Sequence, residues 1–324
     1  MAPIEGEHIK TIAQKAGRTT PGKSGISYEM IASLSDENLV KIGQLMSNEL
    51  RWPKSSCLKE TVIRMLHKGG EHTKISNYRP IALAECLGKI LTRVMARRMQ
   101  NIMEKNNKWS EAQAGFRPQK DTSLNISKLL ATLARANKQP RWVTFLDIRK
   151  AYDSIPHWTI SQSLRGLGFN EATITTIREI YTNNTTQVIT PWGLTKKIHT
   201  NLGVRQGDPL SPILFNIVLD PVLKAMEEVE GGTILAFADD ICIIAESREV
   251  MEKCLQTFQT ESTKRNLIVN GSKSGFFVTN NCQEHLNLEV QGEQIPWLRE
   301  SSYKYLGIMI NQKMDPTDQD KKTG

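Results

Sequence analysis

Cysteine is scarce in this 324-residue sequence, and its five occurrences form no pattern that disulfides or metals use. They are odd in number and far apart, and none lies in a C-x-x-C pair: Cys57, Cys86, Cys242, Cys254 and Cys282. This excludes a disulfide framework and is typical of reduced thiols in an intracellular compartment. The six histidines do not combine with the cysteines at zinc-ligand spacing, which excludes a zinc finger or knuckle.

Long hydrophobic runs are also absent. No apolar run approaches the roughly 18 residues that a transmembrane helix needs, and the first 20 residues carry five charged side chains without an apolar block. We therefore expect no secretory signal and no membrane partner. A content of 39% hydrophobic and 23% charged residues is typical of a globular protein, and the length favours about two domains or one large domain with lobes.

Acidic residues are few in one part of the chain. Residues 51–120 contain 15 Lys and Arg against 5 Glu and no Asp, a balance of +10, so the rest of the +8 chain sums to −2. A basic block beside a near-neutral remainder indicates a polyanionic partner. A solvated charged face is the ordinary alternative, and charge alone does not decide between them.

Apolar periodicity predicts helices and strands that do not alternate regularly. Residues 1–27 are polar and include the loop-like stretch TPGKSG. Helices are expected within 28–50, over 83–100, 155–166 and 171–182, after Pro212, and over 247–264. Strands are expected at 61–66, 142–148, 186–191, 195–200, 234–238, 241–245 and 267–269, and the run ending at Ile308 is also apolar. The irregular order indicates an α+β fold rather than a doubly wound one.

Asp239 and Asp240 separate two apolar runs that have the pattern of β-hairpin arms, so we expect them to form the two-residue link. An Asp in such a link is often only a turn residue. Two adjacent carboxylates repel each other, however, and a divalent cation is the simplest compensation.

Asp147 interrupts the apolar run 142–148, where an unpaired carboxylate would be costly. A lone Asp at a strand end is more often a helix cap or a turn residue. Taken with Asp239 and Asp240, it could hold a pair of Mg²⁺ ions. Two metals roughly 3.5–4 Å apart can activate an attacking hydroxyl and stabilise the leaving oxygen of phosphoryl transfer. The three carboxylates therefore predict nucleotidyl transfer.

Seven motifs occur in an order that resembles the reverse transcriptase domain of non-LTR (LINE-type) retrotransposons, from about residue 18 to 310. They are NYRPIAL (77–83), QAGFRP (113–118), FLDIRKAYDSI (145–155), GVRQGDPLSPILFN (203–216), FADD (237–240), NGSKS (270–274) and YKYLG (303–307). The resemblance implies an α+β right-hand polymerase core, in which an antiparallel palm sheet with flanking helices follows the fingers.

The resemblance also implies roles at the reaction centre. Asp147, Asp239 and Asp240 resemble the catalytic, metal-binding aspartates of the palm, with the Ile148 carbonyl as a further ligand of two Mg²⁺ ions (or Mn²⁺). Tyr152 is similar to the aromatic residue that excludes a ribose 2′-hydroxyl, although it could be a packing residue. Lys273 resembles the lysine beside the leaving pyrophosphate, for which a surface lysine is the rival interpretation.

Further residues resemble nucleotide, template and primer contacts. Lys68 and Arg79 are the best matches for the triphosphate, with Lys74 and Arg117 as weaker ones. Gln206 and Gly207 resemble the segment beside the incoming dNTP, where glycine allows close backbone approach. Template and primer contacts are implied for Arg117, Arg205, the stripe Lys89, Arg93 and Arg97, and the turn Tyr305, Leu306 and Gly307. A solvated face is the alternative for the stripe.

The expected organisation is an N-terminal extension at 1–50, fingers at 51–140, palm at 141–300, and a primer-grip hairpin with the start of a truncated thumb at 301–324. The implied activity is RNA-directed DNA polymerisation with an RNA template, a DNA primer or target, and dNTPs, in the nucleus. An RNA-dependent RNA polymerase is one alternative. A truncated or decayed product that binds nucleic acid is another, and we expect processive synthesis to need sequence beyond this chain.

Overall fold

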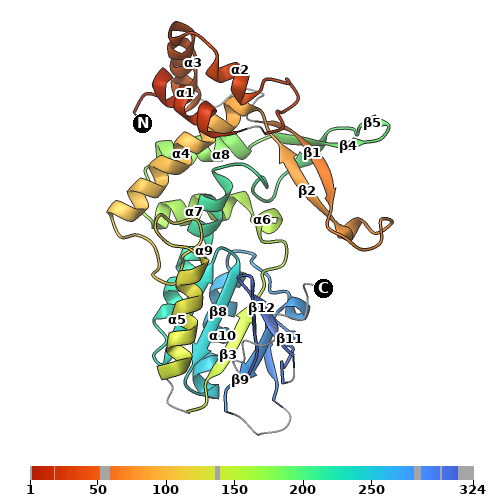
Figure 1. Ribbon diagram of the computed structural model, residues 1–324. Coiled ribbons are helices and arrows are strands. Elements are labelled where there is room, and N and C mark those ends of the chain that lie inside the picture. The colour runs from red at the N-terminus through yellow and green to blue at the C-terminus, as the bar shows by residue number, and fades with distance from the viewer. Residues whose placement is uncertain are drawn as a thin grey trace. The chain divides into compact units, whose positions relative to one another are not determined.

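The computed structural model describes residues 2–17, 19–51, 59–135, 139–280, 286–299 and 301–312. The chain forms two compact units, each built from two stretches of sequence (Figure 1). Unit 1 consists of Met1–Asn106 and Ile155–Leu214, and unit 2 consists of Asn107–Ser154 and Phe215–Gly324. The expected boundaries at 50, 140 and 300 differ from this division, because residues 155–214 return to the first unit. Cys57, Cys282 and the end of the expected thumb segment lie outside the described residues.

Unit 1 combines helices with one five-stranded sheet. Its elements are α1 (Gly6–Lys15), α2 (Tyr28–Ala32), α3 (Asp36–Glu49), β1 (Glu60–His67), the 3-10 helix η2 (Ile75–Asn77), β2 (Tyr78–Leu83), α4 (Cys86–Lys105), α7 (His157–Gly166), α8 (Glu171–Tyr181), β4 (Asn184–Thr190), β5 (Gly193–Leu194) and β6 (Ile198–Thr200). The strand order is β2-β1-β4-β5, with β6 also paired to β4. β1 and β4 run parallel, with Glu60 opposite Thr185, and this pairing joins the two stretches of the unit.

The N-terminal part of unit 1 is more helical than the sequence predicts. The polar stretch 1–27 contains α1, whose Ile9, Ile12 and Ala13 are buried. The single helical region expected at 28–50 is two helices, because the chain leaves α2 and begins α3 at a new cap. The Ser35 hydroxyl there accepts a hydrogen bond from the backbone N–H of Asn38.

Unit 2 is built on an antiparallel four-stranded sheet with the order β7-β8-β3-β9. Its elements are α5 (Thr122–Arg135), β3 (Trp142–Leu146), α6 (Ala151–Ser154), α9 (Ser211–Glu227, which begins in unit 1), β7 (Gly232–Phe237), β8 (Asp240–Ala245), α10 (Arg248–Thr263), the 3-10 helix η3 (Gly271–Lys273), β9 (Gly275–Val278), and the hairpins β10 (Leu288–Val290) with β11 (Glu293–Ile295) and β12 (Tyr303–Tyr305) with β13 (Ile308–Ile310).

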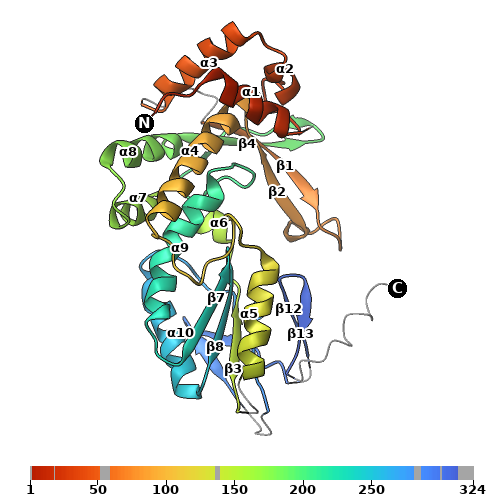
Figure 2. The same ribbon diagram turned by 60° about the vertical axis from the view of Figure 1, so that its left-hand side comes forward.

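The two faces of this sheet bury different elements, as alternation along a strand requires. Val143 and Phe145 of β3 pack in one core cluster with Leu129 of α5 and Tyr305 of β12. Thr144 points the other way, and its hydroxyl contacts the Met251 sulfur of α10 at 3.3 Å. Figure 2 shows α5 on one face and α10 on the other. The sheet is therefore covered on both sides and fixed in register.

Most expected elements of unit 2 are confirmed, with one exception. The run 267–269 forms no named strand; it contributes an isolated antiparallel bridge between Ile148 and Val269. Besides β8, β3 pairs with β9, a strand that the sequence did not predict. No helix within the described ranges is long and apolar enough to cross a bilayer.

Candidate active site

Three carboxylates meet at one end of the unit 2 sheet. β3 and β8 are antiparallel, and their last paired residues at this end are Leu146 and Ile241. Asp147 follows Leu146 and Asp240 precedes Ile241, so the two aspartates lie on neighbouring strands at the same end of the sheet. Asp239 lies in the turn before β8. The register thus brings together side chains that are 92 residues apart in sequence.

The turn differs by one residue from the prediction. Phe237 pairs with Asp240, so the two-residue link consists of Ala238 and Asp239, and Asp240 is the first residue of β8. Ala238 has a φ of +56°, a left-handed conformation that costs free energy for a residue with a Cβ. The surrounding structure must therefore hold this turn in place.

The buried side chain of Gln113 provides that support. Its Oε1 accepts hydrogen bonds from the backbone N–H groups of Ala238 and Gly115, both at 2.8 Å. Its Nε2 donates to the Ala238 carbonyl at 3.3 Å. A Cβ at Gly115 would lie 2.3 Å from the Ala238 nitrogen, so only glycine fits there. Two residues of the QAGF stretch thus fix the turn that carries Asp239.

The NGSKS stretch fixes the end of β3 in a similar way. The backbone N–H of Asp147 donates to the Ser274 hydroxyl at 3.1 Å, and the Asp147 carbonyl accepts from the Asn270 N–H at 2.8 Å. Lys273 is exposed and belongs to η3 of this same segment. The role of the Ile148 carbonyl as a ligand stays a prediction.

The electrostatics of the carboxylates show that they are close to one another. Burial, followed by the charges of Asp239 and Asp147, raises the pKa of Asp240 from 3.8 to about 6. Burial also raises the pKa of Asp239, the Asp147 charge adds to this, and the Lys273 ammonium opposes it. The site therefore concentrates negative charge in a half-buried position, with one ammonium facing it.

These residues were expected to hold two Mg²⁺ ions. Among the residues that the structure describes, no three His, Cys, Asp or Glu side chains lie in an arrangement that could hold a metal ion. The donor chemistry nevertheless fits Mg²⁺, which takes oxygen ligands, uses few protein carboxylates and leaves positions for water and substrate phosphates. A cation there would also neutralise the negative charges of Asp239 and Asp147, which add to the effect of burial on the pKa of Asp240. The metal site stays a proposal.

Tyr152 lies beside this centre in α6. Its ring stacks on Phe215 of α9, with the centroids 5.3 Å apart and the planes 8° from parallel. Burial, followed by the Asp239 charge, raises the pKa of its hydroxyl, so the side chain stays neutral. Tyr152 is thus both a packed aromatic and a neighbour of the carboxylates, and the two interpretations of it are compatible.

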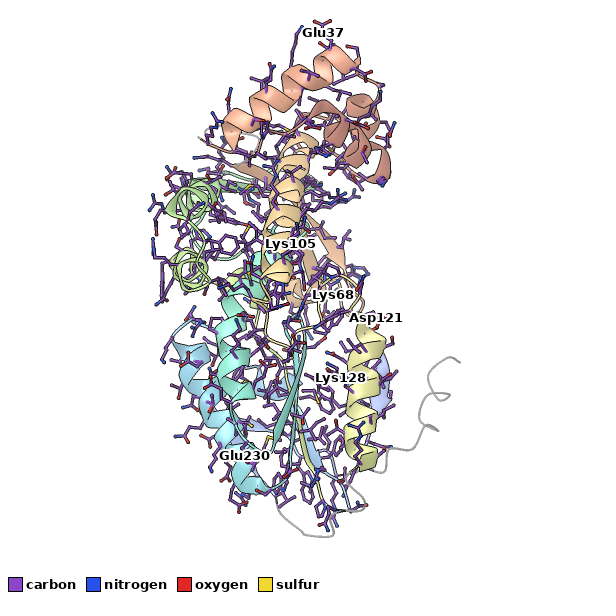
Figure 3. The ribbon with its side chains drawn as sticks, turned by 90° about the vertical axis from the view of Figure 1, so that its left-hand side faces the viewer. Glu37, Lys68, Lys105, Asp121, Lys128 and Glu230 are labelled. Atoms are coloured by element: carbon purple, nitrogen blue, oxygen red, sulfur yellow. The ribbon has the colours of Figure 1, made fainter. Side chains whose placement is uncertain are left out.

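The expected triphosphate contacts lie in unit 1. Lys68 follows the last residue of β1 (Figure 3), and Arg79 lies opposite Leu66 in the same hairpin, so both exposed cations share one end of it. Lys74 forms an ion pair with Glu71 at 2.9 Å. Their roles in binding a nucleotide stay predictions.

The RQGD segment of unit 1 is anchored by buried groups. The Arg205 side chain is largely buried, with Nη1 3.9 Å from a carboxylate oxygen of Asp208 and its guanidinium over the Tyr181 ring. The Gln206 carbonyl accepts from the Ala82 N–H of β2 at 3.1 Å. At Gly207, with a φ of +101°, an added Cβ would lie 3.4 Å from the Ala82 carbonyl oxygen. This distance is an ordinary van der Waals contact, so the positive φ and not a lack of space favours glycine here, and the close approach of a nucleotide to Gly207 stays a prediction.

The other predicted nucleic-acid contacts differ in accessibility. Within α4, Arg97 is exposed whereas Lys89 and Arg93 are half-buried. Arg117 braces its own loop by donating from Nη1 to the carbonyls of Ser110 and Gln113. Arg97 is therefore more accessible than Lys89, Arg93 and Arg117.

The expected primer grip is the β12–β13 hairpin of unit 2. Tyr305 is buried, and its ring packs 5.2 Å from that of Phe145. Leu306 and Gly307 form the turn between the paired Tyr305 and Ile308. Of the three residues predicted to contact the primer, Leu306 and Gly307 are accessible, whereas the Tyr305 side chain is part of the core.

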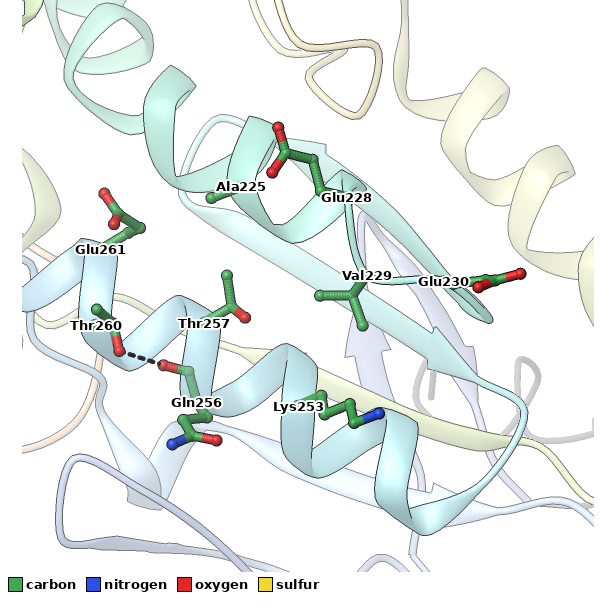
Figure 4. Close-up of a pocket in the computed structure, with 9 residues that line it drawn as sticks. All are labelled: Ala225, Glu228, Val229, Glu230, Lys253, Gln256, Thr257, Thr260 and Glu261. Carbon is green, nitrogen blue, oxygen red and sulfur yellow. Dashed lines mark hydrogen bonds between the residues drawn. The ribbon is translucent and has the colours of Figure 1, made fainter.

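A surface cavity of about 510 Å³ lies elsewhere on unit 2, between the end of α9 and α10 (Figure 4). Glu228, Glu230 and Glu261 line it together with Lys253. Glu261 forms ion pairs with Lys264 and Arg265 of its own helix region. None of the three predicted catalytic aspartates lines this cavity.

The model of the reverse transcriptase (RNA-dependent DNA polymerase) family matches residues 66–310. The Pol polyprotein of the type-1 retrotransposable element R2 from Popillia japonica is 32% identical over 286 residues, covering 84% of this chain and 39% of the relative. The RNA-directed DNA polymerase from mobile element jockey of Drosophila funebris is 25% identical over 329 residues, covering 96% of this chain and 36% of the relative. The chain thus spans about two fifths of these relatives or less.

Solved structures give a consistent result. Telomerase from Candida tropicalis in complex with a fragment of telomeric RNA aligns with a TM-score of 0.57 at 12% identity, over 81% of this chain and 45% of that one. Apo telomerase from the same species, truncated from its C-terminal domain, aligns with a TM-score of 0.52 at 16% identity, over 75% and 54%. At such identities the likeness concerns the fold, and it confirms the expected α+β polymerase class. Because the family model covers most of the chain, as the seven ordered motifs predict, the chain belongs to the reverse transcriptase family.

Proposed function

We propose that this chain carries the reaction centre of an RNA-directed DNA polymerase of a non-LTR retrotransposon, which adds dNTPs to a primer 3′-hydroxyl on an RNA template. The observation that supports this most is the convergence of Asp147, Asp239 and Asp240 at one end of the sheet, where burial and then mutual repulsion raise the pKa of Asp240 to about 6. The family match supports the same proposal, under which the protein would act in the nucleus.

Different residues of the chain would have different roles in the reaction. Asp147, Asp239 and Asp240 would hold Mg²⁺, which supplies an activated hydroxyl and charge neutralisation at the phosphate when bound. Gln113 keeps the Ala238–Asp239 turn in its left-handed conformation, so the carboxylates need no rearrangement when substrate arrives. The charge of the exposed Lys273 ammonium lowers the pKa of Asp239, and this side chain would stabilise negative charge on a leaving pyrophosphate.

Tyr152 would select the sugar of the incoming nucleotide. Its ring cannot move freely, because it is stacked on Phe215, and a rigid ring beside Asp239 would clash with a 2′-hydroxyl. We expect the parent chain to extend an RNA-templated DNA primer with dNTPs in preference to NTPs. We expect Tyr152→Ala to reduce that preference at least about tenfold by raising NTP incorporation. Rates of single-nucleotide incorporation, measured with a dNTP and an NTP of the same base, give this preference for the parent and for the variant.

Tyr152→Phe is the matched control, because it keeps the ring and the stacking and should keep the preference. A Tyr152→Ala variant that incorporates NTPs no faster than the parent would show that this residue is not the gate. A parent chain that prefers NTPs would show instead that the protein is an RNA polymerase.

A further inference from the structure

The β4–β5 hairpin of unit 1 exposes an unusual amount of apolar surface. Trp192 at its tip is 92% exposed, and Ile189, Leu194 and Ile198 beside it are also exposed. Ile189 and Leu194 are direct cross-strand partners, so they lie on one face of the hairpin. Figure 1 shows β4 and β5 projecting from the rest of unit 1. A large aromatic side chain in this position is a binding feature rather than a packing one.

The tip is held rigidly. The Thr190 hydroxyl donates to the Gly193 carbonyl at 2.7 Å and accepts from the Trp192 N–H at 3.3 Å. Pro191 restricts the backbone between them. Trp192 is therefore presented on an ordered turn, which lowers the entropy that a binding partner must overcome.

The charged side chains of the hairpin segment itself are all basic. No Asp or Glu occurs from Ile180 to Gly207, whereas Lys196 and Lys197 lie on the returning segment and are exposed. Lys197 pairs with Glu60 of the neighbouring strand β1 at 2.7 Å, so Lys196 is the more available of the two cations. An exposed indole beside lysines, in a stretch without acidic residues, complements a chain of bases and phosphates.

We propose that this hairpin is a contact surface for single-stranded nucleic acid, with Trp192 stacking on an unpaired base and Lys196 facing a phosphate. The proposal rests on the proposed function in one respect, that a polymerase must hold its template. It adds a site outside the seven motifs. A protein partner would also cover an exposed tryptophan, but it would not require a stretch free of carboxylates.

The test measures binding of a fluorescein-labelled single-stranded RNA by anisotropy, with the whole chain. Trp192→Ala should weaken binding about 5- to 100-fold, because each base stacked on an aromatic side chain contributes that much. Trp192→Phe should restore most of the affinity. The matched control is Trp158→Ala, because Trp158 is also exposed, at 58%, and lies on α7 of the same unit. Lys196→Gln should lower the slope of log affinity against log salt by about 1.

Equal RNA affinity for Trp192→Ala and the parent would overturn the proposal. If self-association in sedimentation is altered as well, the hairpin is instead a contact between copies of the chain. Failure of the proposed function looks different: the parent would then not extend a primer at saturating template, while the effect of Trp192 on binding would persist.

Discussion

Asp239→Asn is expected to abolish primer extension while leaving the binding of the RNA template almost unchanged. The amide has the shape of the carboxylate but no charge, so it is a much weaker ligand for Mg²⁺. Losing one such ligand removes several kcal/mol of transition-state stabilisation, and we expect the rate to fall at least about 1000-fold. Extension of a labelled DNA primer on an RNA template, in single turnover, measures this.

Template affinity should stay within about twofold of the parent, because contacts between cations and phosphates dominate it. Gln113 bonds the backbone of Ala238, so the turn should keep its geometry in the variant. Glu230→Gln is the charge control, since Glu230 is exposed in the same unit and lines the cavity away from the three aspartates. Equal extension rates for Asp239→Asn and the parent would refute the assignment of the site.

Asp240→Asn is expected to stabilise the metal-free protein at alkaline pH. The folded protein raises the pKa of Asp240 from 3.8 to about 6, so the folded state binds this proton more tightly than the unfolded state. Stability therefore falls as the pH rises between about 4 and 6, and the loss is complete above that window. The Asn variant lacks this loss of stability. Its free energy of unfolding should be equal to or below that of the parent at pH 4 and above that of the parent at pH 8.

The full shift corresponds to about 3 kcal/mol, but the side chain is partly solvated, so solvent screening reduces the expected gain to about 1 kcal/mol. The thermal midpoint should rise by about 2 °C at pH 8 in EDTA, measured by circular dichroism. Asp121→Asn is a suitable control, because the Ser123 hydroxyl lowers the pKa of Asp121 and removing that charge should give no gain. A gain of equal size at pH 4 and pH 8 would contradict the electrostatic explanation.

The sequence predicts the centre of unit 2 well. The arms of the β7–β8 hairpin and the strand β3 are short apolar runs, the pattern that is typical of strands buried on both faces. The aspartates at their ends follow from the motif order. The physical reason that they meet is the antiparallel register ending at Leu146 and Ile241, which no local pattern contains.

Other features depend on contacts between distant residues and were not predictable. The turn consists of Ala238 and Asp239, not Asp239 and Asp240, and Gln113, 125 residues away, stabilises the positive φ of Ala238. The QAGFRP motif marks Gln113, but nothing in the sequence shows which backbone groups its amide contacts. The parallel pairing of β1 with β4 likewise assigns residues 155–214 to the first unit, where sequence order places them in the palm.

The dependence of single-nucleotide addition on free Mg²⁺ tests the central claim most directly. The parent chain, an RNA template, a DNA primer and one matched dNTP would be mixed over a range of Mg²⁺ concentrations set with a chelator. If Asp147, Asp239 and Asp240 form a metal-dependent centre, the addition rate starts from zero in excess chelator, rises with Mg²⁺ and saturates. An addition rate that is undiminished in excess chelator would contradict the account.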